Sequence, residues 1–227
     1  MLLVAFSCFI AHNGHAQRGT FNYFKFSKKN YYFGITLGFN SSKYFVGQDK
    51  SFIKNDSIRV IESINGPGFN LGIVTNIKFG ENFDLRFLLP TLSFADRRLE
   101  YKLTSGETEL KKLESVFLEF PIHVRYKSKP YKDIRVFVVG GVKYSMDLAS
   151  NSKARKSENL LKISAHDLVG ELGLGFQIFF PYFILSPEMK FSFGMLNILN
   201  RDENLIYSSS INKLFSRGFA ISLHFEG

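Results

Sequence analysis

Apolar and polar residues alternate with a period of two along most of the chain. From Asn30 onward this pattern fills eight stretches separated by turns or loops, and helical spacing is not sustained in any of them. In the first stretch, Phe33, Ile35 and Leu37 alternate with smaller or polar residues. Such alternation is typical of strands with one apolar and one polar face. We therefore predict an all-β chain with strands at 31–40, 69–79, 83–89, 116–126, 134–147, 168–178, 183–195 and 219–225.

The connections between these strands alternate in length. Those after the second, fourth and sixth strands are tight, at 80–82, 127–132 and 180–181. Those after the first, third, fifth and seventh strands are long and polar, at 41–65, 102–112, 150–162 and 197–212. Barrels of the bacterial outer membrane have an even strand number, short periplasmic turns and long extracellular loops. The pattern thus predicts an eight-stranded antiparallel up-and-down transmembrane β-barrel of OmpA/OmpX-like size.

The third strand contains an irregularity at Pro90, where the alternation of apolar and polar residues loses its parity. Proline has no backbone N–H and cannot donate to the ladder of hydrogen bonds between strands. Within sheets it is therefore tolerated at edges and at bulges, where one strand carries an extra residue. We predict a β-bulge at Pro90.

The alternation by itself does not say which face points outward, because a soluble barrel such as a lipocalin alternates too. An eight-stranded barrel has an interior barely wide enough for side chains, and the apolar faces carry many of the 26 phenylalanines of the chain. The opposite faces are rich in Gly, Ser, Thr, Asn and Gln, which suit a narrow lumen. No apolar run reaches the roughly 18 residues that a membrane-spanning helix needs. We predict that the apolar faces contact lipid in the outer membrane of a Gram-negative bacterium.

The amino terminus resembles a secretory signal peptide. Leu2–Ala11 is apolar, and Gly14-His15-Ala16 places small residues at both recognition positions of a cleavage site, although a basic region is missing at the start. The alternative is a buried first strand. We predict a signal peptide at 1–16, a periplasmic segment at 17–29 and the barrel at 30–227. The single cysteine, Cys8, fits a lipoprotein signal poorly and lies in the predicted signal peptide, so the mature protein is expected to lack thiols.

The net positive charge of the chain excludes few classes of binding partner. The chain has 29 Lys and Arg against 20 Asp and Glu, a net charge of +9, which suits lipid phosphates, acidic polysaccharides or nucleic acid. Lys and Arg are dispersed over both ends of the predicted barrel and no nucleic-acid-binding motif accompanies them. We expect outer-membrane lipids and lipopolysaccharide as partners and do not expect nucleic acid.

Several charged residues fall on the polar faces and would share one lumen. Enclosed charges must be paired, so we favour a structural plug of ion pairs over a conduit or proton relay. The predicted charge is about +2, with Asp84 and Asp147 near by. His123 and His224 lack the spacing and further ligands of a metal site, so we expect lumen hydrogen bonds and predict no metal and no cofactor. The predicted network comprises Arg86, Glu119, His123, Arg125, Arg135, Lys143, Glu171, Glu188, Lys190 and His224.

Three segments resemble the PorT family, small outer-membrane barrels of the Bacteroidota type IX secretion system. They are Phe33–Asn40, Phe83–Phe94 with the trailing Arg97–Tyr101, and Leu118–Ile122. The resemblance covers essentially the whole predicted mature chain. It implies a non-enzymatic accessory or assembly role in exporting proteins across the outer membrane, with translocon subunits as partners, and through that cargo a role in gliding motility or virulence.

Two other functions remain open. A generic OmpA- or OmpX-like barrel would act in adhesion or envelope stability through its long loops. An acyltransferase barrel like PagP would need an apolar pocket in the lumen and Ser and His at one rim; the predicted lumen charges argue against that pocket, and we do not expect an enzyme. Basic residues at the rims could contact lipopolysaccharide phosphates, although each is more commonly a solvated side chain: Arg97, Arg98, Lys153, Arg155 and Lys156.

Overall fold

The computed structural model describes residues 21–48, 58–103, 108–148, 163–200 and 211–227. The predicted signal peptide and the predicted loop at 150–162 lie outside these residues. The described elements are helix α2 (Asn22–Ser27) and the strands β1 (Tyr31–Gln48), β2 (Ile58–Ile64), β3 (Gly66–Phe79), β4 (Phe83–Leu103), β5 (Thr108–Lys127), β6 (Ile134–Asp147), β7 (His166–Phe179), β8 (Ile184–Gly194) and β9 (Ile211–Glu226).

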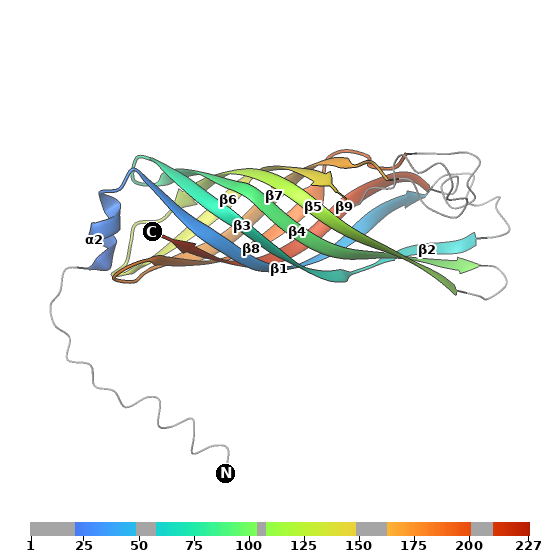
Figure 1. Cartoon of the computed structure of the whole chain (residues 1–227), viewed down its shortest axis with the longest axis horizontal. Helices are drawn as coiled ribbons and strands as arrows, with labels where there is room; N and C mark the ends of the chain where they lie inside the picture. The colour runs from blue at the N-terminus through green and yellow to red at the C-terminus, as the bar shows by residue number, and fades with distance from the viewer. Residues whose placement is uncertain (1–20, 49–57, 104–107, 149–162, 201–210) are drawn as a thin grey trace, which may run out of the picture.

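The strands form one closed antiparallel barrel (Figure 1). Strand β2 is separated from β3 only by Asn65, and both pair with β4, so they act as one strand of the barrel wall. β1 pairs with β3 and with β9, and β4 pairs with β5, which closes the cylinder. The wall therefore has eight strands, and the predicted fold class is confirmed.

The two faces of the wall have the orientation that the alternation predicts. Outward-facing apolar side chains are exposed, with Phe39 at 79% and Phe191 at 61%. Inward-facing neighbours such as Thr36 and Ser222 are buried. Phe137 and Val139 of β6 depart from this pattern because they are apolar yet lie buried inside the lumen.

The bulge predicted at Pro90 is confirmed. The register of β4 shifts against β5 between Phe87 and Thr91, and that of β4 against β3 shifts between Gly72 and Val74. The extra residue inverts the parity of β4, so that Leu88 and Thr91 both face inward and are buried. The bulge thereby lets one strand keep a continuous polar lumen face on both sides of the proline.

The predictions of long loops at 41–65 and 102–112 are wrong in extent. β1 continues to Gln48, β2 occupies 58–64, and β4 and β5 have 21 and 20 residues. A tilted strand needs only about 9–11 residues to cross the membrane, so these strands extend well past it. Antiparallel pairing along β4 and β5 satisfies the backbone N–H and C=O groups of the extension, which explains why polar sequence remains in strands.

The tight turns, the carboxyl terminus and helix α2 lie at the opposite end of the barrel (Figure 1). We call this the inner end, because outer-membrane barrels place their short turns in the periplasm. The helix was not predicted. Phe26 of α2 is buried against Tyr32, Phe179 and Ile184, so part of the predicted periplasmic segment covers the inner end.

Further hydrogen bonds hold the helix in place. Asn22 Nδ2 donates to the carbonyl of Phe179 at 3.2 Å, and Lys78 Nζ donates to the carbonyl of Phe26 at 2.6 Å. A cavity of about 370 Å³ lies between the helix and the lumen. No helix among the described residues is long and apolar enough to cross a membrane.

Candidate functional site in the barrel lumen

The lumen face brings together charged side chains from six strands. At the inner end, Asp84 of β4 accepts hydrogen bonds from Arg125 Nη2 at 2.6 Å and from the Tyr32 hydroxyl at 2.9 Å. Lys127 Nζ also pairs with Asp84. Burying a carboxylate is costly unless it is paired, and this carboxylate has two cations and a hydroxyl as partners.

Arg86 links this cluster to the middle of the lumen. Its guanidinium pairs with Glu188 at 2.6 Å and with Glu226 at 2.5 Å, and its Nε donates to Asn76 Oδ1 at 2.9 Å. The side chains of Arg86, Glu188 and Glu226 are 0% exposed. All three strands that supply them, β4, β8 and β9, are therefore tied together through one buried guanidinium.

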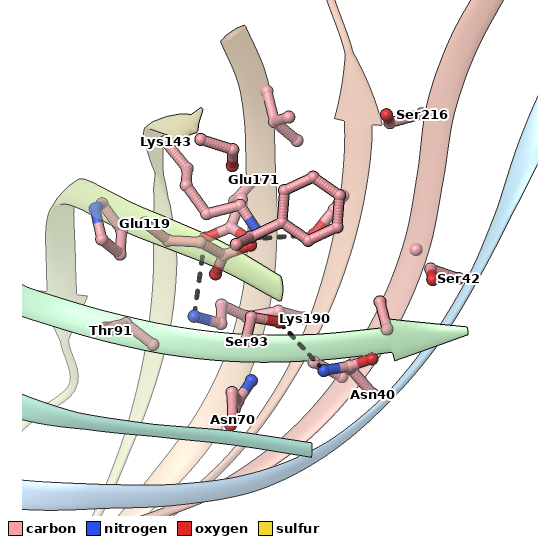
Figure 2. A pocket seen from close by; sticks show the side chains of 18 of the residues that line it. Asn40, Ser42, Asn70, Thr91, Ser93, Glu119, Lys143, Glu171, Lys190 and Ser216 are labelled. Carbon is pink, nitrogen blue, oxygen red and sulfur yellow. Dashed lines mark hydrogen bonds and ion pairs between the residues drawn. The ribbon is translucent and has the colours of Figure 1, made fainter. Parts of the chain in front are cut away.

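Glu171 of β7 is the centre of the next cluster toward the outer end. It pairs with Lys143 Nζ at 3.0 Å and with Lys190 Nζ at 3.5 Å, and it accepts a hydrogen bond from the Ser192 hydroxyl at 2.9 Å. Lys143 also pairs with Glu119 at 3.0 Å. Figure 2 shows Glu119, Lys143 and Glu171 pointing toward one another from the neighbouring strands β5, β6 and β7.

The predicted histidines belong to these clusters. His123 Nε2 lies 2.7 Å from Glu171 Oε2, and His224 Nε2 lies 3.5 Å from Glu188 Oε1. Both imidazoles are fully buried. The histidines therefore face separate carboxylates, and no group of three or more potential ligands that could hold a metal occurs within the described ranges.

The charge balance of the lumen differs from the predicted excess of positive charge. Arg135 forms no ion pair with a described carboxylate; it donates instead to the carbonyls of Ser128 and Glu81 at the inner turns. Lys127 and Glu226 take part although the sequence analysis did not assign them, and Asp84 is a full member. The described network holds five cations and five carboxylates: Arg86, Arg125, Lys127, Lys143 and Lys190 with Asp84, Glu119, Glu171, Glu188 and Glu226.

Lys127 and Glu226 were not predicted as lumen residues because both lie at strand ends. The chain stops one residue after Glu226, and Lys127 begins a tight turn. The alternation of inward and outward residues could have identified them. Lys127 comes two residues after the inward-facing Arg125, and Glu226 comes two residues after the inward-facing His224. Two buried guanidinium groups, of Arg86 and Arg125, also lie 5.7 and 4.9 Å from the ring of Phe137, which therefore packs within the network.

The outer half of the lumen is lined mainly by small polar side chains. Asn40, Asn70, Thr91 and Ser93 line a cavity of about 60 Å³ together with the charged cluster around Glu171, and Asn40 Nδ2 donates to Ser93 Oγ at 3.2 Å (Figure 2). A cavity of this size has room for water. The outer half thus keeps a cavity beside its charged cluster, whereas in the inner half paired charges and Phe137 pack against one another.

The basic residues predicted at the rims lie in different places. Arg97 does not extend from the rim; it lies in the mouth of the lumen between the rings of Tyr44 and Phe117, at 4.9 and 4.6 Å. The prediction that Arg97 is an exposed basic residue at the rim is therefore wrong. Arg98 faces outward beside Asp96, at 3.8 Å. The remaining three, Lys153, Arg155 and Lys156, lie outside the described residues.

Together these contacts fill most of the described lumen. An eight-stranded barrel has little internal space, and here the space is filled by paired charges, by Phe137 and, at the inner end, by helix α2. The arrangement holds the wall strands together by ion pairs between strands that are distant in the sequence.

Comparisons with known proteins agree with this architecture. A family model described as "Outer membrane protein beta-barrel domain" matches residues 16–200. No match was found among curated protein sequences.

Several solved structures are similar to the chain at low identity. Neisserial surface protein A (NspA) has 8% identity and a TM-score of 0.46, with 87% of this chain and 97% of that chain covered. OprG from Pseudomonas aeruginosa has 10% identity and a TM-score of 0.46, with coverages of 87% and 95%. Ail, the attachment invasion locus protein of Yersinia pestis, has 12% identity and a TM-score of 0.37, with coverages of 88% and 100%.

Proposed function

The chain belongs to the outer membrane β-barrel domain family and is located in the outer membrane, and from that premise we propose that it is a closed, non-enzymatic barrel. It acts through the strands that it extends beyond the membrane, in adhesion or envelope stability. The observation that carries the proposal is the length of β4 and β5, at 21 and 20 residues, against the roughly 9–11 that a membrane crossing needs. About half of this hairpin is therefore available outside the membrane.

The filled lumen supports a role that does not depend on transport through the barrel. The five cations and five carboxylates occupy the space that a conduit or an acyl-chain pocket would need. Buried ion pairs also hold strands firmly, because breaking one pair leaves an uncompensated charge. A rigid, closed barrel is suited to anchoring an extracellular surface.

The proposal is tested by shortening the β4–β5 hairpin. Replacing residues 98–112 with an Asn-Gly turn keeps Arg97 paired with Leu113 as the last pair of the hairpin. We expect the shortened protein to insert and fold in the outer membrane, as read by heat-dependent gel mobility. Cells that carry it should adhere to polysaccharide-coated surfaces no better than cells that lack the gene. Adhesion equal to that of the wild type, at equal protein level, would contradict the proposal.

A second candidate is an accessory or assembly role in the type IX secretion system of the Bacteroidota, with translocon subunits as partners. The observation that favours it is the placement of the segments that resemble the PorT family. Residues 33–40 of β1, 83–94 of β4 and 118–122 of β5 lie on one side of the barrel, since β3 pairs with β1 and β4, and β4 pairs with β5. A shared wall that includes the Pro90 bulge could form one contact surface for a partner.

Gene deletion separates the two candidates. If the barrel assists type IX secretion, its loss should abolish secretion of type IX cargo and gliding while the outer membrane stays intact, and the tagged protein should co-purify with secretion components. Normal secretion in the deletion strain would rule out this second candidate. It would leave the role of the outer hairpin to be decided by the adhesion experiment.

A further inference from the structure

A hollow of about 620 Å³ lies on the outside of the wall near the outer end, over β1, β8 and β9. Four phenylalanines and two cations dominate its lining, and no carboxylate is among the described residues that line it. We call it the outer groove and define it by Lys43, Phe45, Phe191, Phe193, Arg217 and Phe219. None of these residues belongs to the lumen network.

The two cations of the outer groove are direct neighbours. Lys43 of β1 and Arg217 of β9 are opposite each other in the β1–β9 register, and both are exposed. Neither forms an ion pair with any described residue; the Arg217 guanidinium lies 5.5 Å from the ring of Phe45. Like charges directly opposite each other on a sheet are destabilising. An anion bound between them would remove this repulsion.

The groove lies at the boundary of the apolar belt. Outward residues of β1 are apolar from Tyr31 to Phe39, and Lys43 is the first outward cation. On β9 the outward residues from Phe225 to Phe219 are apolar, and Arg217 follows. Twelve residues separate Tyr31 from Lys43, which corresponds to about 30 Å along the barrel axis for a tilted strand. The apolar band of such barrels is roughly 25 Å tall, so Lys43 lies just beyond it. The cations are thus level with the phosphates of outer-leaflet lipids.

We propose that the outer groove binds a phosphorylated lipid of the outer leaflet, the lipid A portion of lipopolysaccharide. Lys43 and Arg217 bind one phosphate monoester, and an acyl chain lies along Phe191 and Phe219, whose rings are 5.1 Å apart. A phosphate monoester carries about −1.5 to −2 charges at neutral pH, which matches two adjacent cations better than the single charge of a phosphodiester. This assignment goes beyond the proposed function, since it requires only the position of the barrel in the membrane.

The site is tested by binding to the purified full-length barrel in detergent, measured by native mass spectrometry. The probes are bisphosphorylated lipid A, lipid A without phosphate, phosphatidylglycerol and inorganic phosphate. The test variant is K43S/R217S. The matched control is K28S/K129S, which removes two exposed cations from the inner end and changes the net charge equally.

Wild type and control should bind bisphosphorylated lipid A equally, and K43S/R217S should bind it at least about tenfold more weakly, because two charge-assisted contacts are lost. The conservative variant K43R/R217K should keep the affinity. Unchanged affinity in K43S/R217S would overturn the site. Equal binding of phosphatidylglycerol, or full competition by inorganic phosphate, would overturn the assignment of lipid A as the occupant.

A second readout is the resistance of the folded barrel to urea, measured without and with added lipid A. In detergent without added lipid, K43S/R217S should be at least as resistant to urea as the wild type, because the substitution relieves the repulsion between two cations. Added lipid A should stabilise the wild type and the control but not K43S/R217S. Equal stabilisation of all three proteins would contradict the proposed site.

Discussion

The inner and outer halves of the lumen are lined by the same polar faces of the same strands, yet they are filled differently. In the inner half, Arg86 and its partners are completely buried and each charge has a counter-charge. In the outer half, hydroxyls and amides share a cavity of about 60 Å³ with the outermost charged cluster, which contains Glu119, Lys143 and Glu171. Charges in a narrow space must be paired within the protein, whereas hydroxyls and amides accept water as a partner. Alternation alone therefore predicts a polar lumen but does not distinguish the part filled by paired charges from the part that keeps a cavity.

The largest expected effect comes from breaking the inner half at its centre. Arg86→Met removes the nearest cation of both Glu188 and Glu226, which are buried. Glu188 keeps only Lys190 at 3.6 Å and His224 at 3.5 Å, and Glu226 keeps only Arg125 at 3.6 Å. We expect the free energy of unfolding to fall by about 3–5 kcal/mol, the usual cost of removing one partner from a buried ion pair. Urea unfolding of the protein in lipid vesicles measures this loss.

The matched control lies in the outer half. Arg97→Met makes the same chemical change, but Arg97 forms no ion pair within the described residues. It contacts two rings and donates hydrogen bonds of 3.3 and 3.4 Å to the hydroxyls of Ser42 and Ser216. We expect a loss of about 1 kcal/mol. Equal losses in the two variants would show that the two halves do not differ in the way that we describe.

A smaller effect is expected at the inner end, where α2 covers the lumen. Phe26→Ala removes a ring that is 3% exposed and should weaken docking of the helix by about 2 kcal/mol. Because the helix has only six residues, it should detach while the barrel stays folded. Hydrogen exchange of residues 22–27 should become faster in this variant. Phe24→Ala, at a side chain 52% exposed, is the control and should leave exchange unchanged.

A much smaller effect than that of Arg86→Met is expected when the whole central triad is replaced together. The variant R86M/E188M/E226M removes the guanidinium and both carboxylates together and roughly keeps the side-chain volume. Arg125 keeps Asp84 as its partner, and Lys190 keeps Glu171. Its unfolding free energy should lie within about 1–2 kcal/mol of the wild type, because replacing a buried ion triad as a unit by apolar residues is close to neutral. If this variant is as unstable as Arg86→Met, the ion pairs themselves stabilise the inner half, and the cost of an unpaired charge is not the main effect.

The sequence was sufficient to predict the strands of the barrel wall and the direction of their faces, but not the contacts between side chains in the lumen. The period-two pattern around Phe33 and Ile35 predicted which face meets lipid, and Pro90 predicted the bulge, because both depend on local geometry. The partner of Arg86 could not be predicted, since it depends on the stagger of β4 against β8 and β9, which are distant in the sequence. Phe137 was not expected in the lumen, because the compensating contact is with the guanidinium groups of other strands.

The lengths of the strands could not be predicted from the alternation of apolar and polar residues either. Residues 98–103 and 108–112 are polar enough to read as a loop, but antiparallel pairing across the hairpin keeps them in strands. The periodicity that marks a lipid-facing strand is lost once the strand leaves the membrane, because neither face is then selected for contact with hydrocarbon. The same reasoning applies to β2, which continues the wall past Asn65.

The central claim, that the paired charges seal the lumen, is tested most directly by conductance in planar lipid bilayers. The wild-type barrel should show no steady single-channel conductance at neutral pH. The variant R86A/E188A/E226A, which empties the middle of the lumen, should show steady openings when it is inserted in the same way. Steady conductance of the wild type equal to that of the emptied variant would contradict the claim that the ion pairs close the barrel.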